Sequence, residues 1–284
     1  MDFNTIKKLL DDAAKGGYAI PAFNFNDCWD LMAIIEAAEE ECSPIFISSV
    51  SYVVNSLSLE LCALMGSLAM RKAKVPVILH LDHSTSIETC KEAVDKGYPS
   101  IMIDASILPL KDNICAVKDV VGYAHAQGVF VEAEIGKIKG KEDENASYHG
   151  DDFLAQVPDA KALVEETGVD MLAVGIGTQH GFYKGKPELN FQRLREVDAV
   201  ISCPLVLHGG TGIPEADVKQ GIKYGIQKVN IGTIIRYTYM STLHDNIEKM
   251  GAVTTPAVLM KETRVEIKKV VKEWIRVCMS NGKA

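Results

Sequence analysis

The sequence lacks a long apolar run, a cysteine framework and an excess of basic residues, and each absence excludes a class of protein. No stretch approaches the roughly 18 to 20 apolar residues that a membrane-spanning helix needs. Residues 1–17 carry acidic side chains among their apolar positions, which is not the pattern of a signal peptide. The formal net charge of −8 argues against a nucleic-acid surface. We therefore expect a cytoplasmic protein that binds neither membranes nor nucleic acid.

The seven cysteines stand singly, and none forms a CxxC pair. They predict neither a disulfide framework nor a cysteine zinc site. We expect them to be small buried residues in a reducing compartment.

The length and composition indicate one ordinary globular unit. The chain has 284 residues, of which 47% are hydrophobic and 24% are charged. This length lies in the range where α/β barrels form a single domain. No linker, low-complexity tract or shift of composition divides the sequence. We expect one domain over residues 1–284.

Short apolar, β-branched runs alternate with amphipathic stretches along the whole chain. Residues 30–41 and 89–96 have helical periodicity, and Gly97 stands where a helix would end. Eight such strand and helix units predict a single-domain (β/α)₈ TIM barrel. The predicted strands are residues 19–23, 45–49, 75–82, 100–104, 129–134, 171–175, 205–208 and 228–231.

The stretch 136–152, GKIKGKEDENASYHGDD, is too polar for a core and longer than a usual connection between a strand and a helix. Loops that follow barrel strands carry the active sites of such enzymes. We predict a mobile active-site loop here.

Polar residues fall at the predicted carboxyl ends of several strands, which converge on one face of a barrel. Three imidazoles far apart in sequence suit a catalytic zinc ion, because three protein ligands leave a position open for substrate. One such histidine alone would more often be structural, but three at strand ends favour the metal. The residues at these ends are Asp82, His83, Glu132, Glu134, His180, His208 and Asn230. The remaining histidines, at 80, 125, 149 and 244, lack this placement and are interpreted as structural or surface residues.

Glycine-rich turns follow two of these histidines. Gly209, Gly210 and Thr211 come directly after His208, and Gly181 and Lys184 follow His180. Backbone N–H groups in such turns can converge on an anion, and barrels commonly bind phosphate on the loops after strands seven and eight. A GGTG run serves equally well as a tight turn, so the motif alone leaves both interpretations open.

Seven ordered motifs resemble class II fructose- and tagatose-bisphosphate aldolases. The resemblance runs colinearly from near residue 5 to at least residue 240, and the compact loops look most like the short subgroup that contains tagatose-bisphosphate aldolases. The motifs are PAFNF (21–25), HLDH (80–83), SIMIDAS (100–106), VEAEIG (131–136), GIGTQHGFYKG (175–185), LVLHGGTG (205–212) and KVNIGT (228–233).

The resemblance implies a role for each matching residue. His83, His180 and His208 would bind Zn²⁺, and Glu134 and Asp104 would meet the metal in an alternative position. Asp82 would be the acid/base at the aldol hydroxyl, and Glu142 the mobile-loop acid/base at the carbanion carbon. The dihydroxyacetone phosphate site, assisted by Na⁺ or K⁺, would comprise Gly181, Lys184, Gly209, Gly210, Thr211, Asn230, Ile231, Gly232 and Thr233.

The implied chemistry is reversible cleavage of a phosphorylated ketose to dihydroxyacetone phosphate and an aldehyde such as glyceraldehyde 3-phosphate. A zinc ion would stabilise the resulting enediolate charge as a Lewis acid, so no Schiff-base lysine is needed. Asp82 would remove the C4 hydroxyl proton in cleavage. The alternative interpretation is that Asp82 takes no part in proton transfer and only orients His83. The resemblance also implies a homodimer or homotetramer and leaves open a non-catalytic accessory subunit.

Departures from the family pattern bear on the substrate. Ser84 and Ala105 replace glycines, and KIKGKED (137–143) replaces a glycine pair in the mobile loop. Fructose enzymes of this subgroup carry an aspartate at the position of Gly232, which favours tagatose 1,6-bisphosphate or another ketose 1-phosphate with an anionic tail. Ile234 and Ile235 depart from the tagatose pattern, while Arg236 is a candidate for the distal anion.

Three alternatives remain open. The first is a fructose-1,6-bisphosphate aldolase. The second is a metal-dependent isomerase or hydrolase on the same fold, which the separated HLDH and IGTQHG motifs disfavour. The third is a non-catalytic paralogue, which has no physical need for three histidines and Asp82.

Overall fold

The computed structural model describes residues 1–138, 153–251 and 253–284. Eight parallel strands close into a barrel in the order of the sequence, as predicted. The strands are β1 (Ile20–Asn24), β2 (Ile45–Val50), β3 (Val77–Ser84), β4 (Ser100–Ile103), β5 (Phe130–Ile135), β6 (Met171–Val174), β7 (Leu205–Leu207) and β8 (Ile226–Ile231).

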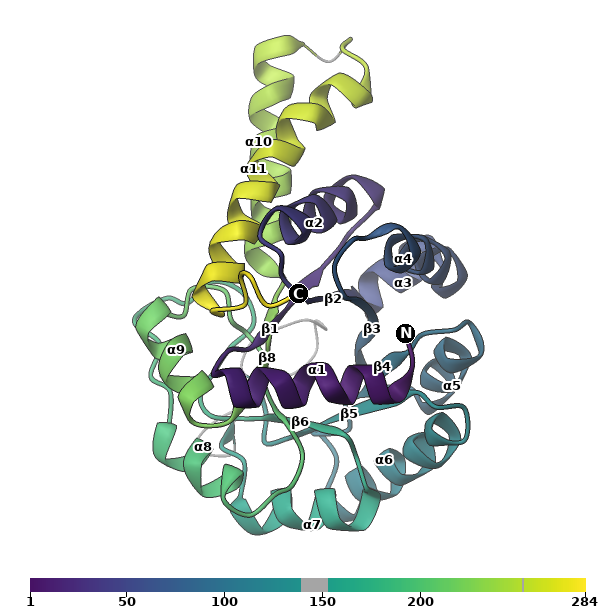
Figure 1. The fold of residues 1–284 in the computed structure, drawn as a ribbon, viewed down its shortest axis with the longest axis vertical. Coiled ribbons are helices and arrows are strands. Elements are labelled where there is room, and N and C mark those ends of the chain that lie inside the picture. The colour runs from purple at the N-terminus through teal and green to yellow at the C-terminus, as the bar shows by residue number, and fades with distance from the viewer. Residues whose placement is uncertain (139–152, 252) are drawn as a thin grey trace.

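Helices surround the barrel, and most connect consecutive strands (Figure 1). The helices are α1 (Phe3–Gly16), α2 (Cys28–Glu40), α3 (Ser51–Leu57), α4 (Leu59–Lys72), α5 (Ile87–Asp95), α6 (Leu110–His125), α7 (Val157–Thr167), α8 (Phe191–Asp198), α9 (Glu215–Lys223), α10 (Thr233–Met250) and α11 (Pro256–Val277).

Local sequence signals set the helix ends. Helix α2 starts with a capping box, in which the Asp27 side chain accepts from the backbone of Asp30 and the Asp30 side chain from that of Asp27. Helix α5 ends at Asp95, two residues before Gly97, which has a φ of 86° that suits glycine. Both predicted helices are therefore present, with starts two residues earlier than expected.

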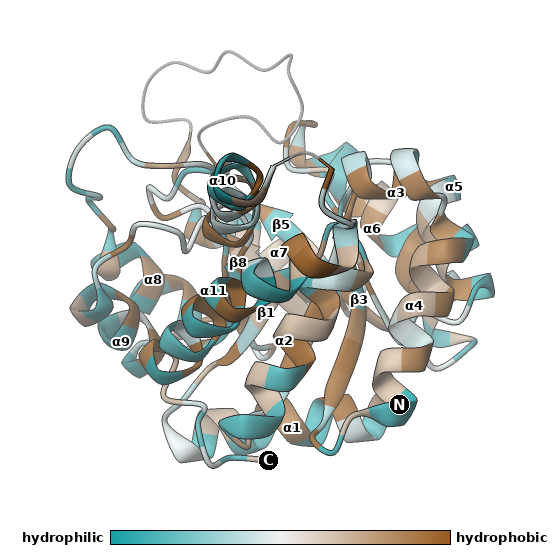
Figure 2. Ribbon diagram, turned by 90° about the horizontal axis from the view of Figure 1, so that it is seen from above, coloured by the Kyte–Doolittle hydropathy of each residue, from teal (hydrophilic) through white to brown (hydrophobic). Residues whose placement is uncertain are grey.

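Helix α1 closes the amino-terminal end of the barrel. Its Ile6 and Leu10 pack in one buried apolar cluster with Phe46, Ile78 and other side chains that point into the barrel. Figure 2 shows α1 and both chain termini at the same end of the molecule. Since this end is filled by apolar side chains, polar chemistry is confined to the interior above it and to the carboxyl ends of the strands.

The last two helices form a hairpin that projects from the barrel (Figure 1). Ion pairs join α11 to the carboxyl end of α2, among them Lys268 with Glu40 at 2.8 Å and Arg276 with Glu41, the residue after α2, at 2.7 Å. Helix α10 starts at Thr233, two residues after the end of β8, so its amino terminus lies at the carboxyl end of the barrel.

The cysteine expectation is partly wrong. All seven thiols are free, as expected, but Cys28, Cys42 and Cys115 are exposed rather than buried. They lie on helix surfaces or turns, where packing does not require a small apolar side chain. In the described part of the chain, no single helix has both the length and the apolar composition to cross a membrane, and only α3 and α4 together, bent by 103°, meet both criteria.

Candidate active site

A small cavity of about 20 Å³ lies at the carboxyl ends of the strands, and most of the predicted site residues line it. These residues come from five strand ends and their loops, so the barrel brings together positions that are up to about two hundred residues apart. The lining comprises Asn24, Asp82, His83, His180, Gly181, His208, Gly209, Gly210, Thr211, Asn230, Gly232 and Thr233.

An irregularity at the end of β3 turns two neighbouring residues into this cavity. Successive side chains of a regular strand point to opposite faces, so Asp82 and His83 should diverge. The register between β3 and β4 shifts between Leu81 and Ser84, and His83 adopts a φ of 49°. This left-handed conformation is strained for a residue with a Cβ and is typical of functional positions. It places both side chains in one pocket.

Of the three predicted zinc-binding histidines, His180 and His208 both lie against His83. Nε2 of His83 lies 2.6 Å from Nδ1 of His208. The rings of His83 and His180 stand edge to face with centroids 4.8 Å apart. Burial lowers the pKa of His180 and of His208 well below the usual value, and the nearby His83 adds to this effect. Neutral imidazole is the form that binds a metal.

Two carboxylates face the other ring nitrogen of His83. Nδ1 lies 3.3 Å from Oδ2 of Asp104 and 4.0 Å from Oε2 of Glu134. Burial would raise the pKa of Asp104, but the hydrogen bond and charge of His83, with donors from Ser106, outweigh it and hold the pKa at about 2. Burial and the charge of Asp104 raise the pKa of Glu134 well above its usual value. The site thus offers possible metal-ligand atoms beside both ring nitrogens of His83.

The donor set fits a divalent metal ion. The ligand atoms of Asp82, His83 and His208 lie within 4.8 Å of one another, as do those of His83, Asp104 and Glu134. Oε2 of Glu134 is buried without a hydrogen-bond partner, which is costly unless a cation completes it. Nitrogen and carboxylate donors in one partly buried pocket suit zinc.

Asp82 is held by an amide rather than by a cation. Nδ2 of Asn230 donates to Oδ1 of Asp82 at 3.0 Å, and the same nitrogen lies 3.3 Å from Nδ1 of His208. Asn230 therefore sets the spacing between Asp82 and the histidine cluster. The carboxylate keeps capacity to accept a proton at the cavity wall.

The predicted phosphate loops lie against the amino terminus of α10. Gly209 has a φ of 67°, and a Cβ there would lie 2.3 Å from the carbonyl oxygen of Gln179. A Cβ at Gly210 would lie 2.8 Å from the carbonyl oxygen of Asn230. The hydroxyl of Thr211 accepts from the backbone N–H of Ile234 at 3.3 Å. This close packing requires glycine at both positions and directs the loop toward a helix start, a favourable place for an anion.

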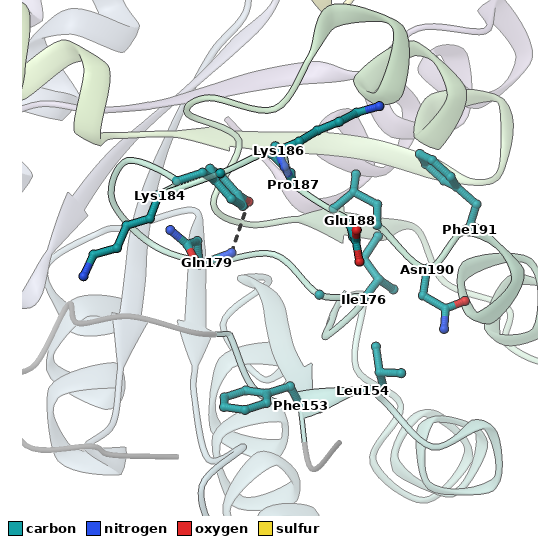
Figure 3. A pocket seen from close by; sticks show the side chains of 14 residues that line it. Phe153, Leu154, Ile176, Gln179, Lys184, Lys186, Pro187, Glu188, Asn190 and Phe191 are labelled. Carbon is teal, nitrogen blue, oxygen red and sulfur yellow. Dashed lines mark hydrogen bonds between the residues drawn. The ribbon is translucent and has the colours of Figure 1, made fainter. Parts of the chain in front are cut away.

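Three other predicted binding residues lie outside the histidine cavity. Ile231 is buried in the apolar core and offers only its backbone. Arg236 is exposed, with its guanidinium 5.5 Å from the centre of the Tyr52 ring. Lys184 lines a different cavity of about 770 Å³ with Gln179, Lys186 and others. Figure 3 shows the amino groups of Lys184 and Lys186 pointing in different directions.

The sequence placed Glu132 at a strand end, which is wrong. Glu132 is the third of six residues in β5, is fully buried, and pairs with Lys228 at 2.7 Å inside the barrel. It points to the same side as Glu134 because the two are separated by one residue. Sequence reasoning also missed Lys228 and Asn24. A lysine within an apolar strand, and an asparagine that ends β1, were the available signals.

The three other described histidines do not line the cavity. His125 pairs with Asp170 at 2.8 Å, and His244 lies on α10 near Glu248 at 3.5 Å, so both are surface or structural residues as expected. His80 is fully buried in β3. Glu142 and His149 lie outside the described residues, as does the predicted mobile loop from residue 139 onward.

Comparison with known proteins decides the family. Residues 4–283 match the family model for fructose-bisphosphate aldolase class-II. The chain belongs to the class II fructose-bisphosphate aldolase family. Class II aldolases are lyases that in general depend on zinc and act on a phosphorylated ketose, yielding dihydroxyacetone phosphate and an aldehyde.

Individual class II aldolases resemble the chain over its whole length. The fructose-bisphosphate aldolase of Staphylococcus aureus (strain N315) is 36% identical over 288 residues and covers 100% of both chains. That of Staphylococcus epidermidis (strain ATCC 12228) is 36% identical over 287 residues, again covering 100% of both. The crystal structure of the YdjI aldolase from Escherichia coli K12 is 38% identical, covers 98% of each chain and has a TM-score of 0.86.

Proposed function

We propose that this class II aldolase cleaves a ketose 1-phosphate with an anionic tail, with tagatose 1,6-bisphosphate as the favoured substrate. The observation that carries the proposal is the convergence of Asp82, the histidine cluster and the glycine-rich loops on one cavity beside the start of α10. These parts supply a proton acceptor, metal ligands and an anion site in the arrangement that aldol cleavage needs.

The metal ligands in this proposal are His83, His180 and His208, with Asp104 and Glu134 as the alternative set around His83. When bound, zinc supplies a Lewis acid that stabilises negative charge on the ketone oxygen. Neutral rings at His180 and His208 leave their nitrogens ready to bind without losing a proton.

Asp82 is the acid/base at the C4 hydroxyl. In cleavage it takes the hydroxyl proton as the C3–C4 bond breaks, and in condensation it returns that proton. Its hydrogen bond from Asn230 restrains the carboxylate where it lines the cavity. Glu142, outside the described residues, is proposed to protonate the carbanion carbon and stays a prediction from the family motif.

The phosphate of the dihydroxyacetone half is proposed to lie on the loops that begin at Gly181 and Gly209 and at the amino terminus of α10. Backbone N–H groups at a helix start attract an anion. Thr211 and Thr233, which line the same cavity, add hydroxyls. From the family resemblance, we also propose that Na⁺ or K⁺ assists this site. Because Lys184 lines the neighbouring cavity, it contributes to phosphate binding only through long-range charge unless its loop moves.

The tail of the substrate is proposed to meet Arg236. This side chain lies on the first turn of α10, and its guanidinium lies over the Tyr52 ring, 5.5 Å from the ring centre. Gly232 adds no carboxylate that would compete for the guanidinium. A substrate with a second anion at this end therefore gains a charge-assisted contact.

The fructose-bisphosphate aldolase function of the named relatives is the second candidate, favoured by their 36% identity over the full chain. One assay separates the two. The zinc form is incubated with dihydroxyacetone phosphate and a panel of aldehydes that differ in tail charge, and each ketose product is identified. Dominant formation of fructose 1,6-bisphosphate would overturn the substrate proposal and leave the aldolase assignment intact.

Two further expectations belong to the proposal. The chain is expected to form a homodimer or homotetramer, which light scattering of the purified protein measures. Turnover by that preparation alone would exclude the need for an accessory subunit.

A further inference from the structure

A group of charged and polar side chains lies inside the barrel, directly beneath the candidate active site. Lys228 of β8, Glu132 of β5 and His80 of β3 are each 0% exposed. Charged residues are almost never fully buried unless they are paired. The three side chains meet, but the proposed aldol chemistry uses none of them.

Lys228 has a well-defined place in this group. Its Nζ donates to Oε2 of Glu132 at 2.7 Å and lies 3.4 Å from Nε2 of His80. The ring of Phe46 lies beneath it, with 5.4 Å from Nζ to the ring centre. Nδ1 of His80 is in turn 2.8 Å from the hydroxyl of Ser100. Lys228 thus binds one oxygen of the Glu132 carboxylate and restrains the orientation of the carboxylate group.

The second oxygen of Glu132 reaches the active site. Oε1 lies 2.7 Å from Nε2 of His208. A carboxylate whose other oxygen accepts from an ammonium group is an acceptor, so Nε2 of His208 is the donor in this contact. A neutral imidazole carries one N–H, and its lone pair must then be on Nδ1. This is the nitrogen that faces Nε2 of His83 at 2.6 Å.

We propose that Glu132 and Lys228 are positioning residues that select the Nε2–H tautomer of His208 and aim its Nδ1 at the metal site. The inference rests on the proposed function in one respect, namely that His208 is a metal ligand. Such partners commonly fix the orientation of a metal-binding histidine, and their loss weakens metal binding about 10- to 100-fold. The competing explanation is that the pair only fills the barrel interior.

The test compares two double variants that differ in a single hydrogen-bond acceptor. Glu132→Gln with Lys228→Met and Glu132→Leu with Lys228→Met both remove the two buried charges. Only the glutamine at 132 can still accept from Nε2 of His208. Ser100→Ala is the matched control, because it removes a hydrogen bond from the same layer, at His80, without touching Glu132. Thermal unfolding of each protein shows that it is folded.

Two readouts are taken, and neither depends on turnover. Long-range ¹H–¹⁵N spectra of metal-free protein labelled in histidine report the tautomer of His208. The signals of His208 are identified by their absence from the spectrum of His208→Asn. Competition with a chelator gives the zinc dissociation constant. We expect the Nε2–H tautomer in the wild type, in the glutamine double variant and in Ser100→Ala. The leucine double variant should lose this preference and bind zinc about 10- to 100-fold more weakly than the glutamine double variant.

Equal zinc affinity in the two double variants would overturn the proposal, and so would an Nδ1–H tautomer of His208 in the wild type. If neither double variant folds, the wild-type tautomer alone decides. Failure of the proposed function is a separate result, because wild-type protein would then bind zinc weakly or show no aldol cleavage whatever the variants do.

Discussion

Asn230 donates a hydrogen bond to Asp82 across the mouth of the barrel, from Nδ2 to Oδ1 at 3.0 Å. The two residues lie on β8 and β3, which are not neighbours in the barrel. The bond therefore spans the cavity and fixes the carboxylate that we assign to proton transfer.

Replacing Asp82 with Ala should lower turnover by about 10² to 10⁴, the usual share of a positioned acid/base. Zinc content and affinity for dihydroxyacetone phosphate should stay near the wild-type values. Proton exchange at the carbon of dihydroxyacetone phosphate, measured by deuterium uptake, should survive better than aldol cleavage because Asp82 acts on the hydroxyl. Equal loss of both reactions would assign Asp82 another role.

Replacing Glu142 with Ala should impair the proton exchange that Asp82→Ala largely spares. The exchange of the carbon-bound proton should slow more than the binding of dihydroxyacetone phosphate, because the family motif assigns this carboxylate to the carbanion. Comparing the two variants in one deuterium-uptake assay separates the two roles. Unchanged exchange in Glu142→Ala would leave the carbanion proton to another group.

Replacing His208 with Ala should remove metal and activity together, because one of three proposed ligands is lost. The wild type should hold one zinc per chain by elemental analysis, and chelation followed by added zinc should abolish and restore turnover. His125→Ala is a suitable control, since His125 pairs with Asp170 on the surface. Full zinc occupancy in His208→Ala would show that the ligand assignment is wrong.

Replacing Arg236 with Ala should lower kcat/KM for a substrate with anions at both ends by roughly one to two decades, the scale of a lost charge-assisted contact of ~1.5 to 3 kcal/mol. A substrate with a neutral tail should hardly change. Arg195→Ala is a matched control, because Arg195 also stacks on a tyrosine, Tyr224, at 5.4 Å. An equal effect on both substrates would place the distal anion elsewhere.

Replacing Gly232 with Ala should disturb Asn24. A Cβ at position 232 would lie 3.1 Å from Nδ2 of Asn24, which is itself buried and has little room to move. We expect kcat/KM to fall by about ten-fold, since small displacements in an active site are costly. Gly122→Ala, where a Cβ meets nothing within 4 Å, controls for the general effect of adding a methyl group. An unchanged kcat/KM in Gly232→Ala would show that Asn24 can move aside without cost.

Much of the fold was predictable because each strand is a short apolar run. Such runs are buried on both faces in a parallel barrel, so their sequence alone separates them from the amphipathic helices. The predicted ends differ from the observed ones by at most two residues, as for residues 75–82 against β3 (Val77–Ser84). The position of a residue near a strand end was correspondingly less certain, and Glu132 was misplaced for this reason.

The sequence by itself determined the barrel, since the spacing of apolar runs depends on local order along the chain, and it predicted that the three histidines and Asp82 lie at or just after strand ends. Only the tertiary structure decided which of these side chains meet. The shift in register at the end of β3 turns Asp82 and His83 into one cavity, against the alternation of a regular strand. Lys228 and Glu132 pair across the barrel although 96 residues separate them. Such contacts depend on strand stagger and closure, which are properties of the whole barrel and leave no local pattern in the sequence.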